Sequence, residues 1–122
     1  MSTLNVSNIT DGTTTVGTSY VVNGSAKAWA ANVLDAATSQ DTLNVSSITD
    51  TGAGDNRINL SNSMAYSNYA VVSMCSAIGN NTNPRNISLF DAPAASYRVY
   101  CTTPSGSGSS IGSHTSVFGD LA

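Results

Sequence analysis

The chain has almost no residues from which the wet face of a surface helix is normally built. Charged residues make up 9% of its 122 residues, Lys27 is the only lysine, and glutamate is absent. An exposed helix face normally carries glutamate, lysine, arginine or glutamine. Serine, threonine and asparagine are abundant instead, and with valine, isoleucine, tyrosine and glycine they suit strands and tight turns. We therefore expect an all-β chain of one domain.

Tight-turn signals separate short apolar segments along the chain. Asn23-Gly24 lies between residues 19–22 and 26–29, which predicts two strands joined by a two-residue hairpin. Residues 50–55 predict a second hairpin that leads into a strand at residues 57–60. The sequence is thus typical of an antiparallel β-sandwich, in which strands and turns follow one another closely.

The apolar run at residues 69–75 predicts a central strand that is covered on both faces. Further strands are expected at residues 86–90, 97–102 and 115–118, with loops at residues 80–84 and 105–113 between them. Residues 26–37 are ambiguous, because Trp29, Val33 and several alanines recur there at helical spacing after Ser25, which could cap a helix.

One segment occurs twice. Residues 4–11 recur at residues 43–50, and the two copies differ only in Asn8 and Ser47. In each copy leucine and valine share one strand face and isoleucine lies on the other, which indicates a β-bulge or a strand end before the turn that follows. The copies are either two strands that meet the same local requirement or the trace of a shared module boundary.

Composition argues against several classes of function. Four basic residues and a net charge of −3 are too few to form a phosphate-binding patch, so we expect no nucleic-acid partner. No apolar run reaches the length of a transmembrane helix, so no membrane insertion is expected. The start, Met1 to Leu4, has no basic segment followed by an apolar stretch, so no signal peptide is expected.

Residues able to carry chemistry are few. Residues 108–112 match the G-x-S-x-G pattern of hydrolases, but they lie in a Ser/Gly-rich loop and the only histidine, His114, is too close in sequence to act as an oriented base. Cys75 and Cys101 are expected to be buried thiols. Asp50, Asp55 and Asn56 form either a calcium loop or, as we favour, turns capped by their own side chains. We expect no enzyme, cofactor or metal.

Tyrosines are the best candidates for contacts with other molecules, since they combine flat apolar area with a hydroxyl group. Tyr69 is expected in the core. Tyr97 and Tyr100 fall on opposite faces of one predicted strand, so one of them should point away from the core and become available to an interface.

Three blocks in this order and spacing give the chain a resemblance to a known family. They are residues 22–29 (Val-Asn-Gly-Ser-Ala-Lys-Ala-Trp), residues 43–55 followed by Asn68 to Val72, and residues 117–120 (Val-Phe-Gly-Asp). Over residues 20–122 the chain resembles a tail-fibre-like surface module of bacteriophages. The resemblance implies an antiparallel β-sandwich in an exposed, often trimeric, virion protein. It also implies a strand at residues 26–31, and it supplies no catalytic residues.

On this basis residues 1–20 are expected to form an arm or docking strand and residues 21–122 the sandwich, which assembles as a homotrimer. The arm would bind another virion protein through Leu4, Val6 and Ile9. Loops of the sandwich would touch a host surface glycan or protein. Their candidate contact residues are Asn80, Asn81, Asn83, Arg85, Ser107, Ser109 and His114.

Other roles compete with that of a host-contacting fibre. A capsid decoration protein or a tail-assembly protein without receptor binding is favoured by size, because only about twenty residues precede the sandwich and a fibre normally carries a long shaft. A free lectin-like domain ranks third, and an enzyme last.

Overall fold

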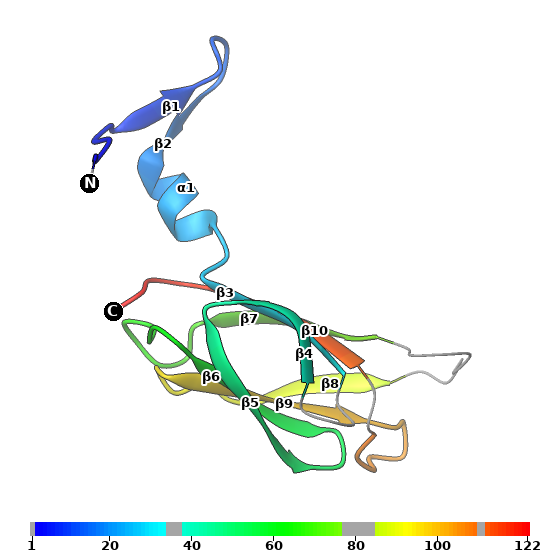
Figure 1. Ribbon diagram of the computed structural model, residues 1–122. Coiled ribbons are helices and arrows are strands. Elements are labelled where there is room, and N and C mark those ends of the chain that lie inside the picture. The colour runs from blue at the N-terminus through cyan, green and yellow to red at the C-terminus, as the bar shows by residue number, and fades with distance from the viewer. Residues whose placement is uncertain (1, 34–37, 77–84, 110–111) are drawn as a thin grey trace.

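The computed structural model describes residues 2–33, 38–76, 85–109 and 112–122. These residues form ten strands and one short helix, and every strand pairing is antiparallel. The all-β expectation is therefore confirmed. A small hairpin and the helix project from the body of the molecule, in which two sheets lie face to face (Figure 1).

The first sheet has the strand order β4-β3-β10-β7, and the second has the order β5-β6-β9-β8. The strands of the first sheet are β3 (Ala28–Val33), β4 (Thr38–Leu43), β7 (Ala70–Ser76) and β10 (Gly112–Phe118). Those of the second are β5 (Val45–Gly52), β6 (Asp55–Leu60), β8 (Asn86–Asp91) and β9 (Ser96–Thr102).

The hydrophobic core lies between the two sheets. It takes alternate residues of the inner strands, because neighbouring side chains on a strand point to opposite faces. Its fully buried residues include Ala28, Val117, Ile58, Tyr97 and Val99. The core ends at Met64, which is buried beneath the C-terminal segment and pairs with Leu121.

The chain crosses between the sheets at Asn44, where the repeated segment of the sequence ends one strand and begins the next. Asn44 has a left-handed backbone (φ 55°), which asparagine tolerates better than most residues. The pairing register then shifts between Val45 and Ser47, as the predicted bulge requires. In the other copy the strand begins only at Asn8, so Leu4 and Val6 precede it. Both copies lead into hairpins, consistent with a shared local requirement.

The structure corrects the predicted strand at residues 19–22. This segment belongs to the helix α1 (Thr18–Gly24), and Asn23-Gly24 ends that helix instead of forming a hairpin. The Ser25 N–H donates to the Val21 carbonyl, and the Lys27 ammonium donates to the Val22 carbonyl. These contacts satisfy carbonyl groups that a helix end leaves without partners.

Residues 28–33 are a strand, so the helix considered for residues 26–37 is wrong where the structure describes it. The predicted central position of residues 69–75 is also wrong. β7 is an edge strand, with Val72 62% and Met74 63% exposed. A continuous apolar run does not by itself distinguish a strand buried on both faces from an edge strand with an apolar outer face.

Candidate functional site

One end of the sandwich is formed by two loops that touch each other. The turn between β5 and β6 and the loop at residues 103–109 lie at the end away from the projecting hairpin and helix (Figure 1). The Cys101 N–H donates to the Gly54 carbonyl at 2.8 Å, and the Ser109 N–H donates to the Cys101 carbonyl at 2.9 Å. The two loops therefore form a single surface, which we call the distal end.

Two glycines make this close approach possible. A Cβ on Gly108 would lie 2.1 Å from the carbonyl oxygen of Ala53, and a Cβ on Gly54 would lie 2.3 Å from that of Cys101. Gly54 also has a left-handed backbone, with φ of 74°. Backbone therefore packs on backbone here, which only glycine allows.

A depression of about 350 Å³ opens between the loops and the outer face of the second sheet. We call it the distal depression, and it is lined by Gly52, Ala53, Asp55, Phe90, Tyr100 and Gly108. Phe90 is 65% exposed, which is unusual for so large an apolar side chain. Two aromatic rings, a carboxylate and loop backbone thus surround one surface hollow.

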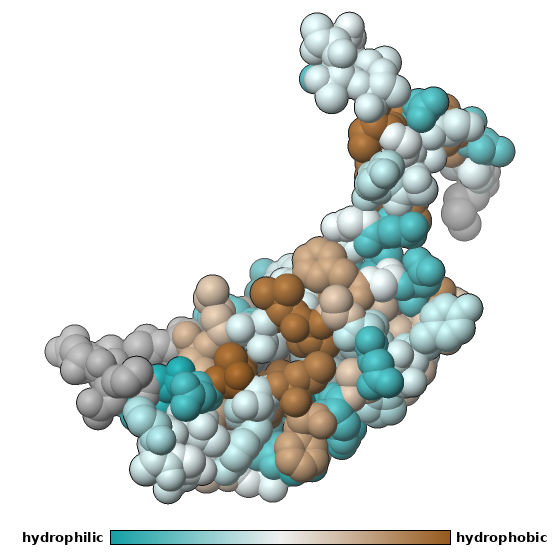
Figure 2. Space-filling view, turned by 180° about the vertical axis from the view of Figure 1, so that it is seen from behind, coloured by the Kyte–Doolittle hydropathy of each residue, from teal (hydrophilic) through white to brown (hydrophobic). Residues whose placement is uncertain are grey.

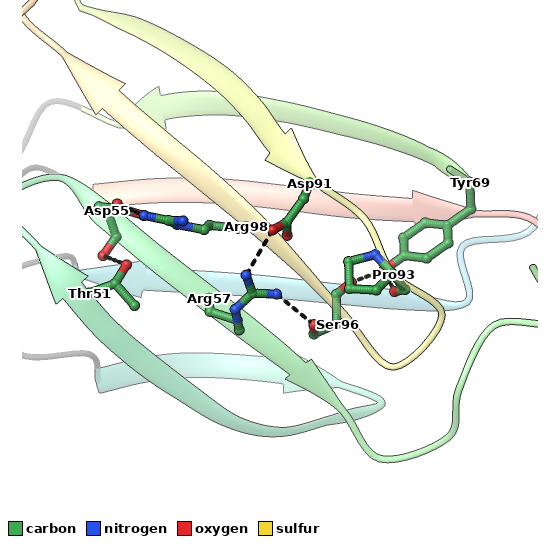
Figure 3. A network of polar contacts seen from close by, with 8 residues as sticks. All are labelled: Thr51, Asp55, Arg57, Tyr69, Asp91, Pro93, Ser96 and Arg98. Carbon is green, nitrogen blue, oxygen red and sulfur yellow. Dashed lines mark hydrogen bonds and ion pairs between the residues drawn. The ribbon is translucent and has the colours of Figure 1, made fainter. Parts of the chain in front are cut away.

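A charged network on the second sheet holds this surface in place (Figure 3). Arg98 donates from Nε to Oδ1 of Asp55 at 2.7 Å and from Nη2 to Oδ2 of the same carboxylate. The guanidinium lies 4.4 Å from the centre of the Phe90 ring. Hydrogen bonds from Arg98 hold the pKa of Asp55 below its usual value. Asp55, Arg98 and Phe90 therefore form one stacked unit at the edge of the depression.

Arg57 lies directly across the strand pair from Arg98, an arrangement that would be repulsive without counter-charges. Asp91 supplies one by accepting from Arg57 Nη2 at 2.8 Å, while Arg57 Nη1 donates to Ser96 Oγ at 2.9 Å. The Tyr69 hydroxyl donates to the backbone carbonyl of Ser96 at 2.6 Å, which connects the segment just before β7 to the start of β9 (Figure 3). The outer face of the second sheet thus carries two arginine–aspartate pairs that cross-link its strands.

Some of the predicted contact residues meet at the distal end. Arg85 Nε donates to Ser109 Oγ at 2.8 Å, and Ser107 is exposed in the same loop. Asn80, Asn81 and Asn83 lie outside the described residues, as does Ser110 of the G-x-S-x-G match. His114 was expected in a loop, but it lies within β10 on the outer face of the first sheet, because that strand begins at Gly112.

The two candidate interface tyrosines point in opposite directions, as the strand pattern predicts. Tyr97 is fully buried, and its hydroxyl lies 2.7 Å from Thr115 Oγ1. Burial raises the pKa of Tyr97 to about 12. Tyr97 is therefore a core residue and not an interface residue, because none of its ring is exposed. Tyr100 is partly exposed in the distal depression, and its proposed role in an interface stays a prediction.

The calcium interpretation of residues 50–56 is wrong. Asp50 Oδ1 accepts from the Gly52 N–H at 2.9 Å, so this side chain caps its own turn. Both carboxylate oxygens of Asp55 accept hydrogen bonds from Arg98, and Asn56 is buried on the opposite face of β6. Three oxygen donors therefore do not converge on one point. Within the described ranges no group of three or more His, Cys, Asp or Glu side chains is placed to hold a metal ion.

The arm, defined here as residues 2–24, projects from the end opposite the distal depression. Its hairpin pairs β1 (Asn8–Thr10) with β2 (Thr15–Gly17), and the Asp11 carboxylate caps the turn by accepting from the N–H groups of Thr13 and Thr14. These hydrogen bonds lower the pKa of Asp11. No residue of the arm is buried, and the predicted docking residues Leu4, Val6 and Ile9 are all exposed.

The outer face of the first sheet carries several apolar side chains beside the polar residues Ser116, His114 and Asp41. Leu43, Trp29, Ser116 and Val72 are cross-strand partners in one row, and Ala31, His114 and Met74 form part of the next row. A shallow depression of about 260 Å³ lies over these side chains. Figure 2 shows hydrophobic side chains gathered on the side of the body that is turned away from the viewer in Figure 1. We call Leu43, Trp29, Ala31, Val72 and Met74 the apolar sheet face.

Comparison with known proteins finds no matching family model, no matching curated protein and no matching solved structure. Among the described residues, no helix is both long and apolar enough to cross a membrane.

Sequence reasoning missed the most exposed aromatic residue of the distal end. Phe90 was assigned to a strand without a role, and Arg98 was not considered at all. The sequence around Phe90 and around Arg98 gives no sign of this arrangement. Asp55 and Arg98 are 43 residues apart and meet only through the pairing of β6 with β9. The turn glycines at residues 52 and 54 did indicate where the loops of this end would lie.

Proposed function

We propose that the chain is a structural protein of a bacteriophage virion, of the tail-fibre or appendage type. Its arm would attach to another virion protein, and its distal end would contact the host surface. The observation that carries this proposal is the layout of the molecule, because the exposed arm and the loops of the distal end lie at opposite ends of the sandwich (Figure 1). The link to phages comes from the sequence resemblance.

The chemistry of the distal depression suits a surface glycan. Sugars bind through flat apolar faces and hydroxyl groups, so aromatic rings beside fixed polar groups recognise them well. Phe90 and Tyr100 supply the rings, while the loop backbone at Gly52, Ala53 and Gly108 supplies polar groups. The Arg98 guanidinium beneath Phe90 holds that ring in one position, which reduces the entropy lost on binding.

The properties of the arm support a docking role. A two-stranded hairpin and a helix of seven residues are each marginally stable alone in water. Leu4 is 85% exposed, and Val22 and Tyr20 on the helix are exposed as well. A segment with no buried side chains of its own gains its stability from a surface on which it packs, and another virion protein would provide that surface.

The apolar sheet face supports self-association, and we propose the homotrimer as the assembled form. This face lacks the arginine–aspartate pairs of the opposite sheet, and Asp41 at its β4 edge is the charged residue that a trimer contact would leave at its rim. It adjoins the unpaired edge of β7, which natural proteins tend to cover. Three weak distal sites would then act together and give useful avidity.

The host-contact proposal is tested with labelled protein and the cells that the phage encoding this chain infects. We expect Phe90→Ala to reduce cell binding at least tenfold, since it removes the most exposed ring of the depression. The matched control is Tyr66→Ala, which removes an aromatic ring of similar exposure far from the distal end. Binding that both variants retain equally, or that wild-type protein does not show, would contradict the proposal.

Capsid decoration remains the alternative, because it requires only the arm and the apolar sheet face. Gold-labelled antibody against the protein, applied to intact phage particles, separates the two roles. Label on the tail supports the fibre role, and label over the head lattice supports decoration.

A further inference from the structure

The two cysteines of the chain face each other across the core. Cys75 lies on β7 of the first sheet and Cys101 on β9 of the second, and their sulfur atoms are 3.2 Å apart. Both thiols are free. They are 26 residues apart in sequence, so only the packing of one sheet on the other brings them together.

The two thiols differ in access. Cys101 is fully buried on a central strand, whereas Cys75 is partly exposed on the edge strand β7. The Cys75 sulfur also lies 3.5 Å from the Asn86 carbonyl of β8, which fixes it at the gap between the sheets. A small oxidant could therefore reach Cys75 but not Cys101.

We propose that Cys75 and Cys101 are an oxidative cross-linking site, at which a disulfide between the sheets forms when the protein meets a small-molecule disulfide outside a reducing cell. The sulfur atoms, 3.2 Å apart, need to approach by about 1 Å to reach bonding distance. The inference does not depend on the virion role proposed above.

The reaction takes two exchange steps, with glutathione disulfide as the oxidant. The Cys75 thiolate attacks one sulfur of glutathione disulfide, so a mixed disulfide forms and one glutathione thiolate leaves. The Cys101 sulfur then attacks the Cys75 sulfur, and the second glutathione thiolate leaves. The two cysteines lose two electrons and two protons, and one glutathione disulfide becomes two glutathione thiols.

The order of the steps follows from the surroundings of the two sulfurs. Burial and the neighbouring Cys75 thiol raise the pKa of Cys101, so its thiolate is scarce and it is a poor first nucleophile. Once Cys75 carries glutathione, Cys101 is already beside the sulfur that it must attack. Proximity then compensates for its low thiolate fraction.

The test uses the full-length folded protein incubated with glutathione disulfide at pH 8. We expect the intact mass to fall by about 2 Da, the mass of two hydrogens, and both thiols to disappear from a titration in denaturant. Peptide mapping without reductant should recover the Cys75–Cys101 bridge. Closing this loop should raise the thermal midpoint by about 10 °C, and reductant should reverse the rise.

Two variants test the order of attack. Cys101→Ser should accumulate a single glutathione adduct on Cys75, whereas Cys75→Ser should stay unmodified while it is folded. Because Cys101→Ser places a hydroxyl in the core and could prevent folding, the wild-type mass and thiol titration decide the proposal by themselves. Two thiols retained by folded wild-type protein, or a bridge between two chains, would each overturn it.

Discussion

Asn56 is a residue whose buried position lowers the stability of the fold. Its side chain is fully buried between the sheets, and among the described residues neither its amide nitrogen nor its amide oxygen has a hydrogen-bond partner. A buried polar group without a partner loses its hydration and gains nothing in return. Sequence analysis assigned Asn56 to a polar turn. It did not reveal the burial of this side chain, because burial depends on which face of the strand meets the other sheet.

We predict that Asn56→Leu increases the free energy of unfolding by about 1–2 kcal/mol, since a side chain of similar size replaces two unsatisfied groups. Urea denaturation measures the change. Asn59→Leu is the matched control on the outer face of the same strand, where the amide donates to Ser47 and Thr49. This control should lower stability or leave it unchanged. A loss of stability in Asn56→Leu would show that the buried amide is paired.

Asp55 makes the fold sensitive to acid. Its pKa is lowered in the folded protein, chiefly by hydrogen bonds from Arg98, so its charged form contributes stability above the unfolded value of 3.8. That contribution is lost as the pH falls through the lower folded pKa. Asp55 and Arg98 are both partly buried, so water screens their interaction less than that of a fully exposed pair.

We predict that Asp55→Asn lowers the free energy of unfolding at pH 7 by about 1–2 kcal/mol, because it removes the acceptor charge that Arg98 requires. The difference between variant and wild type should shrink as the pH falls below 4. Denaturation curves between pH 2 and pH 7 measure this, with Asp120→Asn at an exposed position as the control. A difference that stays constant with pH would contradict the assignment.

At the scale of elements, backbone contact between loops matters as much as strand pairing. The turn between β5 and β6 and the loop at residues 103–109 are connected by the hydrogen bonds around Cys101, and Gly54 and Gly108 allow the two backbones to meet. The helix α1 shows the opposite situation, because nothing lies within 4 Å of a Cβ on Gly24. Close packing therefore requires glycine at positions 54 and 108 but not at position 24.

We predict that Gly108→Ala lowers the free energy of unfolding by about 1–3 kcal/mol, because its methyl group would collide with the Ala53 backbone. Gly24→Ala is the control and should change stability by less than about 0.5 kcal/mol. Thermal unfolding measures both. Amide exchange at Ser109 should also accelerate in Gly108→Ala alone. Equal stability of the two variants would contradict the close packing of these loops.

At the scale of the whole molecule, the two outer faces of the sandwich differ in character. The second sheet carries two arginine–aspartate pairs, whereas the first carries the apolar sheet face with Val72 and Met74. A large apolar surface on a small protein usually marks a contact with another molecule. The proposed trimer would bury this surface and leave the charged sheet and the distal depression in water.

We predict that light scattering at micromolar concentration gives a mass of three chains of 12.4 kDa. Met74→Lys should dissociate the trimer, because a lysine in an apolar contact has no partner for its charge. Ser88→Lys on β8 is the control and should leave the mass unchanged, since it lies outside the apolar sheet face. A stable monomer of the wild-type protein would contradict the trimer.

The amino-acid sequence by itself determined that the chain forms short antiparallel strands, and it placed most of them within a few residues. Strand preference, alternation and turn chemistry act between close neighbours, so they are visible in the sequence. The failure at residues 19–22 has a physical reason as well. An Asn-Gly pair is compatible with the end of a helix as well as with a hairpin turn. Residues 19–22 belong to α1 and not to a strand of either sheet.

Only the tertiary structure decided which strands lie at the edges, which tyrosine is buried and which charges pair. These features depend on contacts between distant residues, such as Asp55 with Arg98 and Cys75 with Cys101, 43 and 26 positions apart. No local preference encodes such a contact, because it exists only after two sheets have formed and packed. The chemistry of the distal end and of the two thiols therefore belongs to the fold and not to any motif in the sequence.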